Sequence, residues 1–121
     1  MELHALTIHE LQEKMKSGAV SSAELTRSVF SQIDAVEDKV HSFIRLMREE
    51  AMEQAARADE QIRQGDIRAL TGIPIALKDI VCTRGIPTTC GSRILQNFVP
   101  PYNATVVEKL TEAGAVFVGK S

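Results

Sequence analysis

The sequence lacks the features that would place a protein in a membrane, in a secretory pathway or on nucleic acid. No apolar run approaches the ~20 residues that a membrane-spanning helix needs, and the N-terminus has no signal-peptide pattern. The 14 basic and 16 acidic residues nearly cancel and leave a net charge of −2. Nothing therefore indicates a broad electrostatic attraction to nucleic acid or anionic lipid. We expect a cytoplasmic protein without membrane contacts.

Cysteine and histidine are scarce as well. The two cysteines, Cys82 and Cys90, lack the paired spacing of a zinc site. We interpret them as reduced, small apolar residues that fill gaps in the core. The three histidines, His4, His9 and His41, are scattered and form no cluster of metal ligands, so we expect them at the surface. The sequence predicts no metal site and no cofactor site in this chain.

The composition suits a small α/β domain. The chain has 121 residues, of which 44% are hydrophobic and 25% charged, and these values are ordinary for a soluble globular protein with one core. Residues 1–66 carry helical patterns, and residues 67–121 carry the first strand patterns. We therefore predict a helical N-terminal layer on a mixed, largely parallel sheet.

Two capping boxes predict the first two helices. Thr7 with Glu10, and Ser21 with Glu24, each combine an N-cap hydroxyl with a glutamate three residues later. An apolar stripe with helical spacing follows the second box and predicts a helix that ends near Asp38. The stripe consists of Leu25, Val29, Ile33 and Val36.

The longest helical pattern runs over residues 47–64. Its inward seam is mostly alanine, which allows a neighbouring element to approach closely. The seam consists of Ala51, Ala55, Ala58 and Ile62. On the opposite, solvated side, Glu53 with Arg57 and Asp59 with Arg63 have the spacing of favourable ion pairs.

Two short apolar runs in the second half predict neighbouring strands. Residues 73–77 follow Gly72 and carry a proline near their start, where its missing donor is tolerated. Residues 115–118 follow a helix for which Asn103 is the predicted N-cap. A strand, a connection that contains a helix and a second strand are typical of a parallel pair. Residues 40–46 are ambiguous and favour a brief extended segment.

Lys78 comes directly after the first of these strands. The alternation of a strand places Ala76 and Lys78 on one face, and Leu77 and Asp79 on the other. A lysine at a strand end most often extends its amine to water. Alternatively, a desolvated lysine has a lowered pKa, and its neutral amine can act as a base. Spacing alone leaves both interpretations open. For Asp79 it favours a hydrogen bond to a nearby loop over a contact with Lys78.

Residues 114–121 match the phosphate-loop pattern G-x-x-x-x-G-K-S. Such a loop must lie between a strand and a helix, with free amides that face the phosphate. The middle residues here predict a strand instead, and we interpret the match as a strand that leaves a helix. Separately, Thr88, Thr89 and Ser92 offer hydroxyls that could line a pocket, although turns use such residues routinely.

The segments around Lys78 resemble the amidase signature family. The resemblance is carried by residues 72–79, 83–85 and 88–92. Residues 92–107 are most similar to the A subunits of glutamyl-tRNA(Gln) amidotransferases. The resemblance covers nearly the whole chain from about Leu6, and it favours the interpretation of Lys78 as a base.

The resemblance implies that residues 1–121 are the N-terminal portion of a single amidase domain, with Lys78 as its catalytic lysine. In the family this lysine takes a proton from a serine held by a cis peptide bond, which in turn takes one from a nucleophilic serine. After Lys78, this chain has only Ser92 and Ser121. Neither lies in the Gly/Ser-rich sequence that supplies the family's nucleophile, so we expect the chain to be inactive alone.

The resemblance also implies partners. The full-length parent would hydrolyse glutamine and pass ammonia to a B subunit, which converts Glu-tRNA(Gln) to Gln-tRNA(Gln) with ATP and Mg that it binds itself. The two would be joined by a small C subunit, and the tRNA would contact mainly the partner. Two alternatives stay open: another amidase that acts on a small amide, and an interaction fragment without catalysis.

Overall fold

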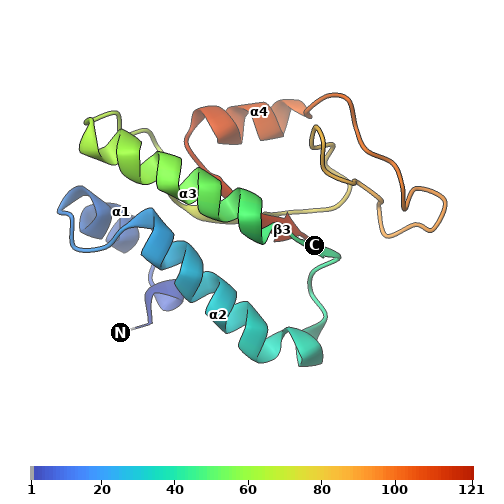
Figure 1. Ribbon diagram of the computed structural model, residues 1–121, viewed down its shortest axis with the longest axis horizontal. Coiled ribbons are helices and arrows are strands. Elements are labelled where there is room, and N and C mark those ends of the chain that lie inside the picture. The colour runs from blue at the N-terminus through green and yellow to red at the C-terminus, as the bar shows by residue number, and fades with distance from the viewer. Residues whose placement is uncertain (1) are drawn as a thin grey trace.

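The computed structural model describes residues 2–121, and its helices lie on a three-stranded sheet (Figure 1). A short 3-10 helix, η1, precedes the first α-helix. The elements in chain order are η1 (Leu3–Ala5), α1 (Ile8–Lys16), α2 (Ser22–Val40), β1 (Arg45–Leu46), α3 (Arg48–Arg63), β2 (Pro74–Leu77), α4 (Thr105–Glu112) and β3 (Val116–Lys120). The predicted α/β class is confirmed.

Both predicted capping boxes are present. The Thr7 hydroxyl accepts a hydrogen bond from the Glu10 amide, and the Glu10 carboxylate accepts one from the Thr7 amide; Ser21 and Glu24 repeat the arrangement. Each box satisfies donors that a helix start leaves without a partner. Helix α2 continues to Val40, two residues beyond the predicted end.

The alanine seam of α3 lies in the core as predicted. Ala51, Ala55 and Ala58 are buried, and the first two pack in one cluster with residues of α2 and β3. The other buried members of that cluster are Phe30, Ile33, Val116 and Val118. Small side chains let α3 lie directly over the sheet while α2 packs beside it (Figure 1). The predicted α2 stripe is confirmed for the buried Leu25 and Ile33 and for Val29, which packs against the core while half-buried. Val36 is half-buried, and the prediction left out the buried Phe30.

One predicted ion pair forms and the other does not. A guanidinium nitrogen of Arg57 lies 3.9 Å from a carboxylate oxygen of Glu53. Asp59 does not contact Arg63; its two carboxylate oxygens accept hydrogen bonds from the backbone amides of Ser22 and Ala23, at 2.6 and 3.1 Å. The amides at a helix start are unpaired and carry partial positive charge. This long-range contact with α2 therefore wins over a solvated pair along α3.

β3 is the central strand of the sheet, whose order is β1-β3-β2. β2 and β3 are parallel, as predicted, and pair from Pro74 with Val116 to Leu77 with Lys120. β1, in the segment that was ambiguous, pairs antiparallel with β3. A Cβ on Gly119 would lie 2.6 Å from the Arg45 carbonyl oxygen, so only glycine admits β1 this closely. The strand reaches Lys120, two residues beyond the prediction.

The start of α4 differs from the prediction. Its N-cap is Ala104, which makes no side-chain cap bond. Asn103 is not the cap, because its side-chain oxygen accepts a hydrogen bond of 2.7 Å from the Arg84 amide. The asparagine thus fastens the long segment between β2 and α4, which extends to one side of the molecule (Figure 1).

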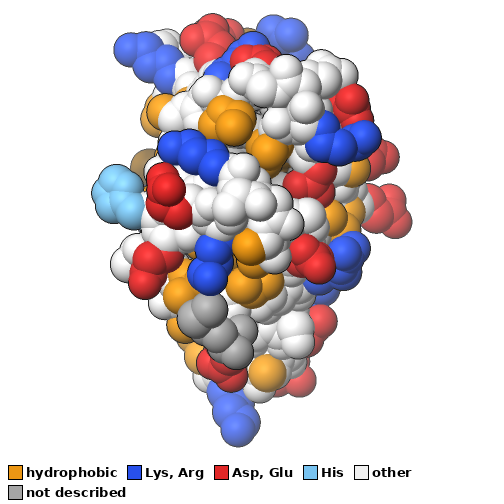
Figure 2. All heavy atoms as spheres, turned by 90° about the vertical axis from the view of Figure 1, so that its left-hand side faces the viewer, with side chains coloured by type: hydrophobic (Ala, Val, Ile, Leu, Met, Phe, Trp, Pro, Cys, Tyr) orange, Lys and Arg blue, Asp and Glu red, His pale blue; other side chains and the backbone are white. Residues whose placement is uncertain are grey.

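Charge is interleaved on the face that Figure 2 presents. Basic and acidic side chains alternate there with small apolar areas, and neither sign forms a continuous patch. Within residues 2–121, no helix combines the length and the apolar character that crossing a bilayer requires.

Candidate active site

Lys78 follows the last residue of β2, and hydrogen bonds hold the backbone on both sides of it. The carbonyl of Leu77 accepts from the Ser121 amide, and the Asp79 amide donates to the Ser121 carbonyl, both at 2.7 Å. The Lys78 carbonyl itself accepts from the Val81 amide at 3.0 Å. Lys78 therefore projects from a backbone fixed by the end of β3.

The predicted alternation around Lys78 is confirmed. Leu77 and Asp79 are buried, while Ala76, Lys78 and Ile80 are exposed. No other described side chain in residues 2–121 makes a hydrogen bond or ion pair with the Lys78 amine. The residues of this chain thus present the amine on an open face and leave its surroundings free for another group.

Asp79 points inward and holds a turn. It is 2% exposed, and one carboxylate oxygen accepts from both the amide and the hydroxyl of Thr89, at 3.0 and 2.5 Å. Its backbone carbonyl accepts from the Cys90 amide at 3.0 Å. The prediction that Asp79 bonds to a nearby loop and not to Lys78 is confirmed.

Lys120 is a part of this site that the sequence patterns did not predict. Its side chain is completely buried, and its ammonium donates to the Val81 carbonyl at 2.8 Å and to the Thr83 and Thr88 hydroxyls at 3.0 and 3.1 Å. These three bonds use all the protons of an ammonium. The Asp79 carboxylate lies 3.7 Å from the same nitrogen. A cation is thus enclosed between the end of β3 and the segment that follows β2.

Two opposing effects act on the Lys120 ammonium. Burial lowers the pKa of Lys120, because removal from water disfavours the charged form. The negative charge of Asp79 raises that pKa and so opposes the shift. Since a buried charge is costly unless it is paired and hydrogen-bonded, the three acceptors and the carboxylate are what keep this cation inside.

The phosphate-loop pattern falls on β3, and the strand interpretation is confirmed. Gly114, with φ +91, follows α4, and the next residues run into the central strand. A Cβ there would lie 2.7 Å from Thr71, which explains the glycine without reference to phosphate. The lysine of the pattern is Lys120, whose three donors are already occupied within the protein.

The predicted hydroxyl residues take different positions. Thr89 and Ser92 line a cavity of about 390 Å³, together with Asp79, Arg93 and residues near β1. Thr88 is buried and contacts Lys120, so it does not line this cavity. The cavity is open to solvent and lies along the segment that Asp79 fastens.

The cysteines and histidines have no shared role. Cys82 and Cys90 are free, and Cys90 is exposed, so its interpretation as a core residue was wrong. The Cys82 thiol lies 3.4 Å from the Tyr102 hydroxyl. His9 and His41 are exposed, whereas His4 is half-buried beside Ser28. Residues 2–121 contain no group of three or more His, Cys, Asp or Glu side chains that could hold a metal ion.

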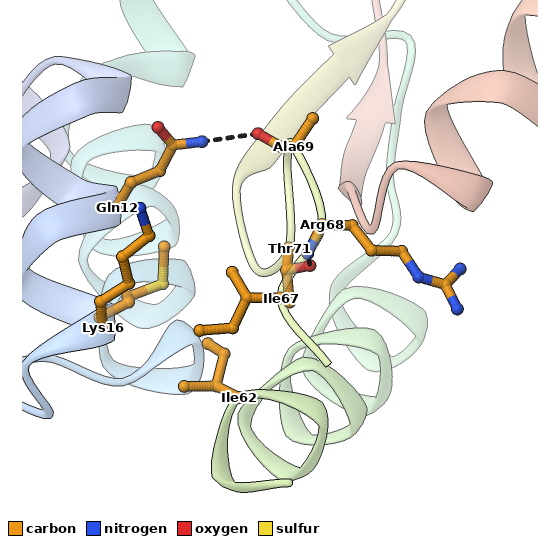
Figure 3. Close-up of a pocket in the computed structure, with 8 residues that line it drawn as sticks. Gln12, Lys16, Ile62, Ile67, Arg68, Ala69 and Thr71 are labelled. Atoms are coloured by element: carbon orange, nitrogen blue, oxygen red, sulfur yellow. Dashed lines mark hydrogen bonds between the residues drawn. The ribbon is translucent and has the colours of Figure 1, made fainter. Parts of the chain in front are cut away.

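A second cavity lies away from Lys78, between α1, the end of α3 and the segment that leads to β2 (Figure 3). Its volume is about 340 Å³. The Gln12 amide closes one side by donating to the Ala69 carbonyl at 2.6 Å. Ile62 and Ile67 form its apolar wall. Its lining offers no arrangement of groups for acid–base or nucleophilic catalysis.

Comparison with known proteins decides the family. The family model described as "Amidase" matches residues 24–121. The chain belongs to the amidase family. It is 68% identical over its whole length to the A subunit of a glutamyl-tRNA(Gln) amidotransferase from Syntrophus aciditrophicus, and 56% identical over 99% of its length to the protein of the same name from Geotalea daltonii. It spans 25% of the length of each.

Solved amidase structures share the fold. The native peptide amidase from Stenotrophomonas maltophilia matches 96% of this chain with a TM-score of 0.90 and 34% identity, and 24% of that enzyme is covered. The arrangement of helices and mixed sheet seen here is therefore a part of the amidase fold, as the resemblance implied.

Proposed function

We propose that this chain is part of the A subunit of a glutamyl-tRNA(Gln) amidotransferase and supplies the base for glutamine hydrolysis. The observation that carries the proposal is the 68% identity, over all 121 residues, to a protein of that name. Lys78 is the residue that we assign to the chemistry. Its fixed backbone and open face suit a group that must meet a second residue from elsewhere in the protein.

Lys78 would act as a proton relay. A serine hydroxyl is a weak nucleophile until a positioned base of suitable pKa removes its proton. In the proposed relay, the Lys78 amine takes the proton of a second serine as that serine takes one from the nucleophile. An amine can do this only in its neutral form, so we expect the complete site to exclude water from Lys78.

The serines of this chain do not supply the nucleophile. Ser92 accepts a hydrogen bond from the Ile94 amide at 3.2 Å, and the Ser121 hydroxyl lies 3.5 Å from the Leu77 carbonyl. Neither is paired with Lys78. We therefore propose that the 121 residues alone have no glutaminase activity.

The proposed protein would work in a complex. B and C subunits, with ATP and Mg on the B subunit, would use the ammonia to amidate Glu-tRNA(Gln), and a cytoplasmic location follows from this role. The absence of a single-sign patch on the face in Figure 2 fits a protein that leaves most of the tRNA contact to its partner.

Substitution of Lys78 in the full-length protein tests the proposal. We expect Lys78→Ala to lower kcat for glutamine hydrolysis by about 10²-fold or more, the loss typical of a missing general base. Lys78→Arg should be equally damaging, because guanidinium stays protonated at any usable pH. The KM should change little, since the base acts on the nucleophile.

Lys109→Ala, which removes an exposed lysine from α4, is the matched control and should leave kcat and KM unchanged. Near-normal turnover of Lys78→Arg would show that the lysine acts as a fixed charge, and the relay would be wrong.

A small-amide hydrolase is the second candidate. The fold shared with the peptide amidase, at 34% identity, favours it. Ammonia release from peptide amides, with none from glutamine and no co-purifying subunits, would establish this alternative.

A further inference from the structure

The Lys78 side chain is held by no other described side chain in residues 2–121, so its position depends on the backbone of the segment around it. That segment is fastened at several points by one residue, Lys120. The ammonium bonds to the carbonyl of Val81, three residues after Lys78, and lies 3.7 Å from the carboxylate of Asp79, the next residue. It also bonds to Thr83 and Thr88 further along.

We propose that Lys120 is a positioning residue for Lys78: its buried ammonium holds residues 79–88 against the end of β3, and so aims the Lys78 amine at its proton donor. This inference rests on the proposed function of Lys78. Lys120 itself is enclosed and does not touch the substrate.

The two threonines that bond to Lys120 are oriented as acceptors. The Thr83 hydroxyl donates its proton to the Val81 carbonyl at 3.1 Å, and the Thr88 hydroxyl donates to the Ile86 carbonyl at 3.2 Å. Each therefore presents its lone pairs to the ammonium. The two hydroxyls therefore complement the buried ammonium of Lys120.

Asp79 gives independent support. One of its carboxylate oxygens accepts two bonds from Thr89, but the other is buried without any hydrogen-bond partner among residues 2–121. That second oxygen is the one 3.7 Å from the Lys120 nitrogen. The ammonium charge compensates it, and the same contact ties Asp79, which adjoins Lys78, to β3.

A double-mutant cycle in the full-length protein, assembled with the partners that co-purify with it, tests the inference. Lys120→Met keeps a side chain of similar length and removes its charge. We expect kcat for glutamine hydrolysis to fall by about 10-fold or more with an unchanged KM, because a misplaced base slows proton transfer without altering substrate binding. Lys109→Met is the matched control and should retain full activity.

The cycle separates positioning from general damage. In a Lys78→Ala background, Lys120→Met should cause no further loss, because no base remains to be aimed. An equal loss in both backgrounds would overturn the inference and leave the role of Lys78 intact. Full activity of Lys78→Ala would instead overturn the proposed function.

Thr88 provides a milder test that does not depend on the folding of Lys120→Met. Thr88→Val removes one acceptor and keeps the shape, and we expect a several-fold loss of kcat at constant KM. Thr88→Ser retains the hydroxyl and should restore most of the turnover. Wild-type kcat in Thr88→Val, or a failure of serine to restore it, would overturn the inference.

Discussion

The capping glutamates of the first half and the buried lysine of the second half use their charges in opposite ways. In residues 2–66, the carboxylates of Glu10 and Glu24 stay at the surface and bond to groups only three residues away. In residues 67–121, Lys120 is enclosed and bonds to groups 32 to 39 residues away. The first arrangement shapes one helix end, whereas the second joins a strand to a distant segment. The capping glutamates thus act over a short range and Lys120 over a long one. The helical half has one long-range contact of its own, because Asp59 accepts hydrogen bonds from the amides of Ser22 and Ala23.

Removal of Asp79 should have the largest effect on stability. Asp79→Ala leaves the buried Lys120 cation without its counter-charge, and the loss of one partner of a buried pair costs about 3–5 kcal/mol. Hydrogen exchange of the amides in residues 79–90 of the full-length protein would measure the loss. Asp38→Ala, at an exposed position near the end of α2, is the control and should change exchange little. If hydrogen exchange in residues 79–90 hardly changed in Asp79→Ala, the buried pair of Asp79 and Lys120 would not stabilise this segment, and its contrast with the capping glutamates would be lost.

Loss of a cap in the helical half should cost less. Ser21→Ala removes the hydroxyl that accepts from the Glu24 amide, and such a change costs about 1 kcal/mol. The effect should appear as faster hydrogen exchange confined to the first turn of α2. Ser31→Ala, at an exposed position within the same helix, should cause no such loss. If exchange also accelerated around Lys78, the helical half would not be locally stabilised.

The smallest expected effect is a dependence on pH. Hydrogen bonds from the backbone amide and hydroxyl of Ser21 hold the pKa of Glu24 below its ordinary value of 4.5. A carboxylate with a depressed pKa stabilises the fold above its unfolded pKa, and this contribution is lost as pH falls through the folded value. The gap in melting temperature between wild type and Glu24→Gln should therefore narrow as pH falls from about 7 to about 3, a range that spans the ordinary glutamate pKa. A gap that is independent of pH would show that Glu24 contributes no charge-dependent stability.

The success of prediction from sequence follows the distance along the chain between the groups that meet. The capping boxes at Thr7 and Ser21 were predicted correctly, because their partners lie within one turn. The alanine seam was also correct, since helical periodicity exposes a buried face. The long-range role of Asp59 at the start of α2 was missed, because spacing along α3 favoured Arg63 equally well.

In the second half, strand alternation placed Lys78 and Asp79 on opposite faces, and the structure agrees. Asn103 was misassigned because an asparagine before a helix resembles a cap, whereas it bonds to the Arg84 amide. Lys120 was missed because it was interpreted only as the lysine of a phosphate-loop pattern. A lysine that continues a fully apolar strand was the available signal.

The sequence by itself determined the helices and the face from which Lys78 projects, because these follow from periodicity and from contacts between near neighbours. The parallel pair of strands followed from the order of a strand, a helix and a second strand. Only the tertiary structure decided that β1 joins the sheet and that Lys120 is enclosed. Both depend on which distant groups meet: the absence of a side chain at Gly119 admits β1, and the cost of a bare buried cation is met only where Asp79, Thr83 and Thr88 converge.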